Sequence, residues 1–124
     1  MATRSTARVK AFESSVELRF ADIIQMLQDQ IGPNLTAYIA GKDTNTVTRW
    51  RKGNQTPTSD AIEARMRTAY QVLKLLTEVD SNHVARAWFI GMNPQLDDRA
   101  PADVLREDGL RDVVIAAKAF RSGG

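Results

Sequence analysis

Residues 35–53, LTAYIAGKDTNTVTRWRKG, predict two short helices joined by a tight turn. Ala37 suits a point where two helices cross closely, because a larger side chain would push them apart. Gly41, four residues later, can take the left-handed conformation that such a turn requires. Val47 and Trp50 lie three residues apart on the second helix and can fill the angle between the two helices. This spacing of Ala, Gly and two apolar residues is typical of a DNA-binding helix-turn-helix.

The exposed face of the second predicted helix carries side chains suited to base edges. Asn pairs with adenine, Arg with guanine, and Thr contacts a thymine methyl group or a phosphate. Residues 42–52 hold four cations and one carboxylate, a net charge of +3 that suits phosphate contacts. The predicted DNA-binding residues are Lys42, Thr44, Asn45, Thr48, Arg49, Arg51 and Lys52. The alternative is a helix pair inside a bundle that never meets DNA.

Outside this stretch the apolar residues repeat with helical spacing, and no segment alternates with a period of two, which predicts an all-α chain. A first helix is expected from about residue 12 to Ile31, with Ser14 and Glu17 as a capping box. Gly32-Pro33 is expected to end it, and Asn34 to cap the second helix. Later helices are expected at 43–52, 59–80, 83–90, 101–106 and 109–120.

These elements predict three parts of the chain. Residues 1–11 form a flexible basic arm, whose Arg4, Arg8 and Lys10 allow a minor-groove or phosphate contact. Residues 12–80 form an N-terminal helix-turn-helix bundle that binds DNA and includes a long connecting helix. Residues 81–124 form a small C-terminal helical module, in which Trp88 and Phe89 are expected in the core.

The composition excludes several classes of protein. The 124 residues are 43% hydrophobic and 26% charged, which is typical of a globular domain. The absence of Cys and the single His83 exclude disulfide scaffolds, zinc fingers and histidine-rich metal sites. The acidic pairs Asp97-Asp98 and Glu107-Asp108 lack the spacing of metal ligands, and no phosphate-binding glycine loop is present. We expect no enzyme, cofactor, metal or membrane span, and a cytoplasmic location.

The C-terminal residues resemble the toxin-binding domain of the Xre/MbcA/ParS antitoxin family. That family has a Trp-containing helix, an Asn-Pro-x-Leu turn, Arg-x-Pro before a short helix, a Gly and a Val-rich last helix. The matching pieces are Trp88, Asn93-Pro94-Gln95-Leu96, Arg99-Ala100-Pro101, Leu105, Gly109 and Val113-Val114. The sequence RWRKGNQTP at 49–57 likewise resembles the end of an Xre/Cro-type recognition helix and its loop. Asp97-Asp98 stands where the family usually has Gly, and the turn is expected to survive because turns tolerate Asp.

The resemblance implies an antitoxin of a type II toxin–antitoxin pair. Its partner would be a RES-domain toxin that degrades NAD⁺, and the C-terminal domain would cover the entrance to the toxin's active site. The helix-turn-helix would bind the operon's promoter and repress it, which implies association with the nucleoid. A homodimer within a larger toxin–antitoxin complex is also expected.

The predicted toxin-binding residues are apolar or basic: Met92, Leu96, Arg99, Arg106, Arg111, Lys118 and Arg121. Equally, Arg99, Arg106 and Arg111 can each pair with Asp97, Asp103, Glu107 or Asp108 in an exposed network of little energetic weight. Two other functions stay open at this point. One is a stand-alone repressor whose C-terminal helices only dimerise, and the other is an adaptor whose helix-turn-helix has lost DNA binding.

Overall fold

The structure, a computed structural model, describes residues 18–123 and is all-helical over that range. Its elements are α2 (Phe20–Ile31), α3 (Pro33–Ala40), α4 (Thr44–Arg51), α5 (Asp60–Thr77), α6 (Asn82–Ile90), the 3-10 helix η1 (Pro94–Leu96), α7 (Pro101–Arg106) and α8 (Leu110–Arg121). The all-α class predicted from the sequence is confirmed. The expected basic arm at residues 1–11 lies outside the described residues.

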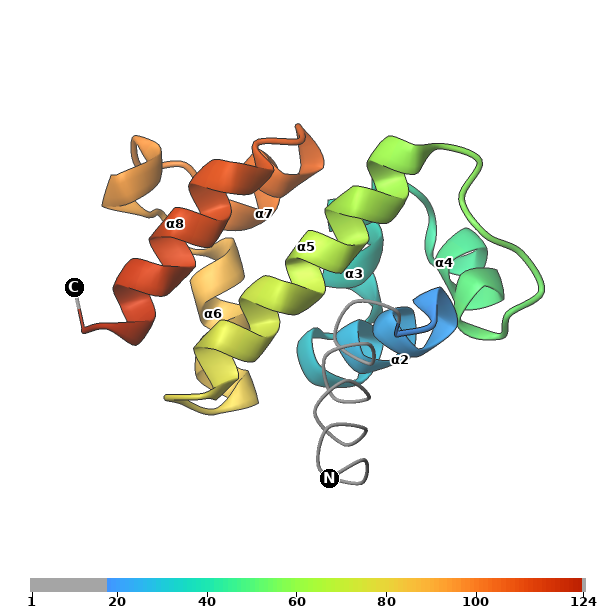
Figure 1. Ribbon diagram of the computed structural model, residues 1–124, viewed down its shortest axis with the longest axis horizontal. Coiled ribbons are helices and arrows are strands. Elements are labelled where there is room, and N and C mark those ends of the chain that lie inside the picture. The colour runs from blue at the N-terminus through green and yellow to red at the C-terminus, as the bar shows by residue number, and fades with distance from the viewer. Residues whose placement is uncertain (1–17, 124) are drawn as a thin grey trace, which may run out of the picture.

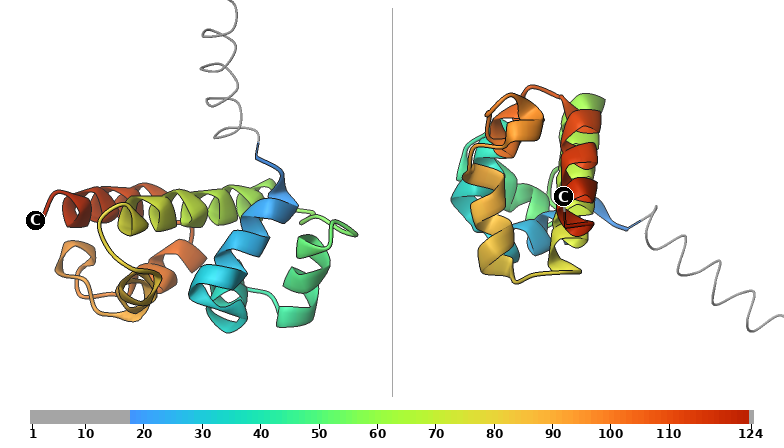
Figure 2. Two further views of the ribbon diagram at one scale, coloured as in Figure 1. Left: turned by 90° about the horizontal axis from the view of Figure 1, so that it is seen from below. Right: turned by 90° about the vertical axis from the view of Figure 1, so that its left-hand side faces the viewer.

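Two helices, α5 and α8, lie side by side and run in the same direction, forming one layer of the molecule (Figure 1). The other helices form a second layer against them, with α2, α3 and α4 at one end and α6 and α7 at the other (Figure 2). Within this second layer α2 contacts α6, and α3 contacts α7. The N-terminal and C-terminal segments therefore pack against each other directly as well as through α5.

A single hydrophobic cluster connects all seven α-helices of the described residues. Its fully buried side chains include Ile24, Leu27, Val47, Met66, Leu73, Phe89, Leu105 and Val113. Trp88 is half-buried and packs against this cluster, and its ring lies edge-on to those of Phe89 and Phe120. Because the cluster draws on both segments, 12–80 and 81–124 share one core. Their separate roles in binding stay a prediction.

The first described helix begins later than the sequence pattern predicts. Arg19 has an extended backbone conformation, and α2 starts at Phe20 without a side-chain cap. Its first turn is closed by the backbone, because the Arg19 carbonyl accepts the N–H groups of Asp22 and Ile23 at 3.0 and 3.1 Å. The expected capping box of Ser14 and Glu17 lies outside the described residues.

Gly32 and Pro33 end one helix and start the next with no intervening loop. Helix α2 ends at Ile31 as predicted, and Gly32 follows at a φ of 94°. Pro33 is the first residue of α3, a position where the missing proline N–H costs nothing. The prediction that Asn34 caps this helix is therefore wrong, because Asn34 is already its second residue.

Helices α5, α6 and α7 start within one residue of the positions expected from the sequence. The Ser59 hydroxyl accepts the N–H of Ile62 at 3.4 Å at the start of α5, and the Ser81 hydroxyl accepts that of Val84 at 3.2 Å at the start of α6. Pro101 opens α7 at its first position. Side-chain caps and proline placement thus fix where these helices begin.

Candidate nucleic-acid interface and partner surface

The turn between α3 and α4 is tight and depends on Gly41. This residue has a φ of 71°, in the left-handed region that glycine adopts without strain. Its N–H donates to the carbonyls of Ala37 and Tyr38, and the N–H of Lys42 also donates to that of Ala37. The chain passes from α3 to α4 within residues 41–43, as the sequence predicts.

Helix α4 has an inner apolar face and a capped start. The Asp43 carboxylate accepts the N–H of Thr46 at 2.7 Å, and this hydrogen bond lowers the pKa of Asp43 below its ordinary value. Val47 and Trp50 are buried, and the Trp50 ring meets that of Phe20 edge-on with centroids 5.7 Å apart. These two side chains hold α4 against the core at the positions predicted from their spacing.

The outer face of α4 is open to solvent. Thr44, Asn45 and Arg49 are exposed, and Thr48 is half-buried. Lys42 precedes the helix and Lys52 follows it, and both are exposed. Over residues 18–123 no ion pair engages Lys42, Arg49 or Lys52. The structure therefore brings six of the predicted DNA-binding residues to one helix and its two ends, with three uncommitted cations.

Arg51 differs from the other six because its guanidinium contacts α2. It lies 3.0 Å from a carboxylate oxygen of Asp29 and donates to Gln28 Oε1 at 3.3 Å. The Arg51 side chain thereby helps to dock α4 on α2. Sequence spacing gave no indication of this contact, which joins residues 23 positions apart. A phosphate contact from Arg51 stays a prediction.

The predicted partner residues of the C-terminal segment lie in different environments. Met92, between α6 and η1, is 81% exposed, the highest value among the large apolar residues exposed in the described chain. Leu96 is 6% exposed and belongs to the hydrophobic cluster. The prediction that Leu96 contacts a partner is corrected here, because η1 turns its side chain into the core.

Three of the arginines that were predicted to contact a partner instead contact other residues of this chain. Arg99 pairs with Glu107 at 2.7 Å, and Arg121 pairs with Glu78 at 3.2 Å. The Arg106 guanidinium lies 4.6 Å from the centre of the Tyr38 ring. The alternative of internal ion pairing is met by Arg99 with Glu107. Arg121 pairs with a carboxylate outside the set named from the sequence, and Arg106 contacts an aromatic ring instead of an acidic side chain.

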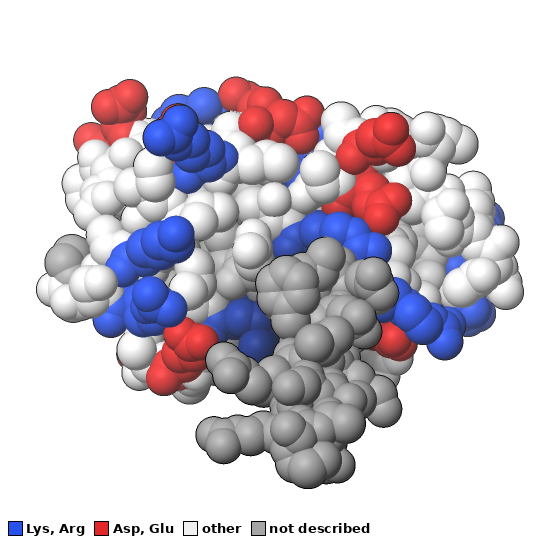
Figure 3. All heavy atoms as spheres, viewed as in Figure 1, with Lys and Arg blue, Asp and Glu red and all other residues white. Residues whose placement is uncertain are grey.

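The other two predicted cations lie on the outer side of α8. Arg111 and Lys118 are exposed, and within the described chain neither forms an ion pair. Ile115 lies between them in sequence and is 50% exposed. Figure 3 shows the face formed by α5 and α8, where cations and carboxylates are interspersed with uncharged surface. This face offers a mixed surface with no continuous patch of one sign.

The turn around Asp97 and Asp98 survives, as expected, although neither residue is glycine. Both have left-handed backbone conformations, with φ values of 56° and 64°. The Asn93 carbonyl accepts the N–H of Asp98 at 2.9 Å, and the Asn93 side chain accepts that of Gln95. Asp is among the residues that tolerate this region best. The loop thus keeps a backbone path suited to glycine.

The described residues contain no group of three His, Asp or Glu side chains that could hold a metal ion. No helix among them has the length and apolar character needed to cross a bilayer. His83 is exposed in the first turn of α6, whose cap is Ser81. The surfaces that stand out in this part of the chain are therefore the outer face of α4 and the exposed side chains of the C-terminal segment.

Comparison with known proteins gives one informative similarity. No protein-family model matches the chain, and no curated protein matches its sequence. Among solved structures, a chain in the crystal structure of the M. tuberculosis MbcT-MbcA toxin-antitoxin complex matches with a TM-score of 0.70. The match has 24% sequence identity and covers 83% of this chain and 94% of the other. The chain therefore has the all-α fold of a protein found in a toxin–antitoxin complex.

Proposed function

We propose that this protein is an antitoxin that neutralises a toxin through its C-terminal segment and binds promoter DNA through α4. The observation that carries the proposal is the fold match to a chain of a toxin–antitoxin complex, which extends over 94% of that chain. The match includes far more than a helix pair, so it favours an antitoxin over an unrelated helical bundle. The resemblance of the C-terminal residues, from Trp88 to Val114, to an antitoxin family supports the same role.

For DNA binding, α4 would lie in the major groove with its outer face toward the bases. Asn45 and Arg49 supply the hydrogen-bonding groups, and Lys42 and Lys52 supply phosphate contacts at the two ends of the helix. Support comes from the exposure of these residues and from the three cations without ion pairs in the described chain. Binding at the promoter of its own operon would repress synthesis of toxin and antitoxin together, and would place the protein on the nucleoid.

For neutralisation, the partner would be a RES-domain toxin that degrades NAD⁺, with the C-terminal segment covering its active-site entrance. The exposed Met92 is suited to a pocket on a partner, since exposed methionine is typical of interfaces. Arg111 and Lys118 flank the half-exposed Ile115 and are suited to acidic groups around an apolar contact. The antitoxin is proposed to act as a homodimer within the complex, in the cytoplasm and without enzymatic activity of its own.

The DNA role is tested by mobility shift with a duplex from the region upstream of this chain's gene. Arg49→Ala should cost about 1–3 kcal/mol of binding free energy and reduce sequence preference, because it removes a base contact. Arg111→Ala is the matched control, since it removes an exposed arginine from a helix far along the chain. Equal binding by the wild type and Arg49→Ala at all salt concentrations would contradict a base contact from Arg49, and absence of binding by the wild type would contradict the DNA role.

The neutralising role is tested by co-expression with the toxin encoded next to this chain. The double variant Arg111→Glu, Lys118→Glu should lose growth rescue, while Arg49→Ala should keep it. Point variants are preferable to truncation after residue 80, because removal of α6–α8 would expose the shared hydrophobic cluster. If the double variant rescues growth as well as the wild type, α8 is not the toxin-binding surface. A protein that binds DNA and has no toxic neighbour would instead be a stand-alone repressor.

A further inference from the structure

We infer that Arg65 positions the turn before α4, with Asp108 as its counter-charge, so that DNA binding by α4 depends on the C-terminal segment. The inference rests on the proposed DNA-binding function. It adds Arg65 as a positioning residue, and it makes DNA binding depend on the C-terminal segment, which the proposed function does not require. Arg65 lies on α5 and Asp108 in the turn between α7 and α8. Neither belongs to the outer face of α4.

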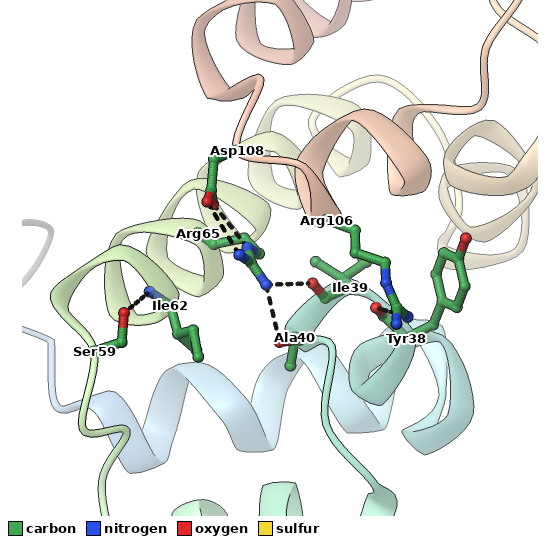
Figure 4. A network of polar contacts seen from close by, with 8 residues as sticks. All are labelled: Tyr38, Ile39, Ala40, Ser59, Ile62, Arg65, Arg106 and Asp108. Carbon is green, nitrogen blue, oxygen red and sulfur yellow. Dashed lines mark hydrogen bonds and ion pairs between the residues drawn. The ribbon is translucent and has the colours of Figure 1, made fainter.

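On one side the Arg65 guanidinium caps the end of α3 (Figure 4). Its Nη1 atom donates to the carbonyl of Ala40 at 2.9 Å and to that of Ile39 at 3.3 Å. The last carbonyls of a helix have no N–H partner within the helix, and a positive charge there is favourable. Arg65 thus supplies the hydrogen bonds that the last two residues of α3 need.

On the other side the same guanidinium holds Asp108 in a two-point contact. Nε lies 2.8 Å from one carboxylate oxygen, and Nη2 lies 3.1 Å from the other. The Arg65 side chain is only 11% exposed, whereas that of Asp108 is 44% exposed. The hydrogen bond from Arg65 also lowers the pKa of Asp108, which keeps the carboxylate ionised. A two-point contact fixes the plane of a guanidinium, so Asp108 determines where Nη1 points.

A second arginine, Arg106 of the C-terminal segment, caps the same helix end. Arg106 Nη1 donates to the Tyr38 carbonyl at 2.9 Å, and its guanidinium stacks on the Tyr38 ring. The Tyr38 hydroxyl in turn donates to Asp103. The last three carbonyls of α3, those of residues 38–40, therefore all accept from arginines of α5 and α7. The end of α3 is therefore held by α5 and by the C-terminal segment together, the latter through Arg106 and through the contact of Asp108 with Arg65.

This helix end sets the direction of α4, because Gly41 follows it immediately. A Cβ atom placed on Gly41 would lie 3.5 Å from Arg65 Nη1, so the turn backbone lies against the guanidinium. If the guanidinium moves, the carbonyls of Ile39 and Ala40 lose their partner and the turn is free to open. The outer face of α4 would then meet the DNA groove at a less favourable angle.

The test compares Asp108→Asn with Glu107→Gln in the full chain. Asp108 has a φ of 67°, which Asn also adopts readily, so the substitution removes the charge and keeps the turn. Glu107 is the neighbouring carboxylate and pairs with Arg99, so Glu107→Gln removes the same charge without touching Arg65. Both variants become more positive, which by itself strengthens DNA binding, so a loss of affinity cannot come from net charge.

Two measurements are made on each variant: hydrogen exchange at the amides of Gly41 and Lys42, and mobility shift with the upstream duplex. For Asp108→Asn we expect exchange about three- to tenfold faster at these amides and DNA affinity about three- to tenfold weaker. Glu107→Gln should match the wild type in exchange and bind DNA at least as tightly. Arg65→Lys keeps the charge and loses the two-point contact, so it should behave like Asp108→Asn.

The outcomes separate the inference from the proposed function. If Asp108→Asn and Arg65→Lys both match Glu107→Gln in exchange and affinity, the inference is overturned. If the wild type binds no duplex, the DNA-binding proposal fails, and the exchange rates alone then decide whether Arg65 positions the turn. Thermal unfolding of each variant identifies global loss of structure, and Arg65→Lys provides the test if Asp108→Asn does not fold.

Discussion

The cations around α4 and several of those in the C-terminal segment differ in what they contact within the molecule. Lys42, Arg49 and Lys52 form no ion pair within residues 18–123, whereas Arg99 and Arg121 do, and Arg106 stacks on Tyr38. Part of the difference follows from the local supply of carboxylates. Residues 42–52 contain only Asp43, which is used to cap α4, while residues 81–124 contain six acidic side chains for six basic ones. Local balance does not decide pairing alone, because Arg111 and Lys118 form no ion pair within the described residues and Arg121 pairs with Glu78, outside residues 81–124.

The largest change in stability is expected from a substitution on the inner face of α4, and a substitution on its outer face is the comparison. Trp50→Ala should lower the free energy of unfolding by about 3–5 kcal/mol, because it removes a large side chain that is 2% exposed. Arg49→Ala, one residue earlier and exposed, should change stability by about 0.5 kcal/mol or less while weakening DNA binding. Chemical denaturation measures both. Similar stability for the two variants would mean that α4 is not anchored through Trp50.

A second test concerns how tightly the C-terminal segment is packed. A Cβ atom on Gly109 would lie 2.5 Å from Val104 Cγ1, closer than real atoms approach. We expect Gly109→Ala to destabilise the protein by about 1–3 kcal/mol through this overlap. Combined with Val104→Ala, the loss should be smaller than the sum of the two single losses, since the clashing methyl group is absent. An additive double variant, measured by denaturant unfolding, would contradict the packing explanation.

The third test uses the carboxylate that caps α4. Asp43→Ala should lower the melting temperature by less than Trp50→Ala does, and Asp43→Asn should largely preserve it because Asn also caps helices. The hydrogen bond from Thr46 holds the pKa of Asp43 below its ordinary value of 3.8. Its contribution to stability is therefore complete above that value and is lost as the pH falls through the lower, folded-state pKa. Thermal unfolding as a function of pH should show a smaller loss at acidic pH in Asp43→Ala.

The smallest effect is expected at the left-handed turn of Asp97 and Asp98. Asp98→Gly should stabilise the protein by up to about 1 kcal/mol, because glycine has no Cβ to strain at a φ of 64°. Asp98→Ala is the matched comparison and should destabilise it, since Ala tolerates this region less well than Asp. Melting temperatures of the two variants decide the sign. Equal values would show that backbone strain at this turn is negligible.

Much of the fold was predictable because its signals are local. Helical spacing identified α5 and α8, and Asp43, Ser59 and Pro101 lie where helix starts were expected. The cap of α6 at Ser81 was not predicted. The errors arose where two signals competed. Pro33 both follows a helix end and starts the next helix, so the expected cap at Asn34 was wrong. Leu96 was assigned to a partner surface because a short loop gives no periodicity that separates a buried residue from an exposed one.

The candidate site was predictable only in part, because some of its contacts are local in sequence and others join distant residues. The residues on the outer face of α4 follow from a period of 3.6 once Val47 and Trp50 are known to face inward. The contacts of Arg51 with α2 and of Arg65 with Ile39, Ala40 and Asp108 join positions 22 to 43 residues apart. No local pattern distinguishes these arginines from those that face solvent. Their partners depend on how the helices pack.

The sequence by itself determined the all-α class, the position of the turn at Gly41 and which face of α4 is polar, because each depends on residues within a few positions of one another. Tertiary structure decided which cations stay available and which hold the fold. It also joined the end of α3 to Arg65, Arg106 and Asp108, since a guanidinium pairs with whatever carbonyl or carboxylate the folded chain brings within about 3 Å of it.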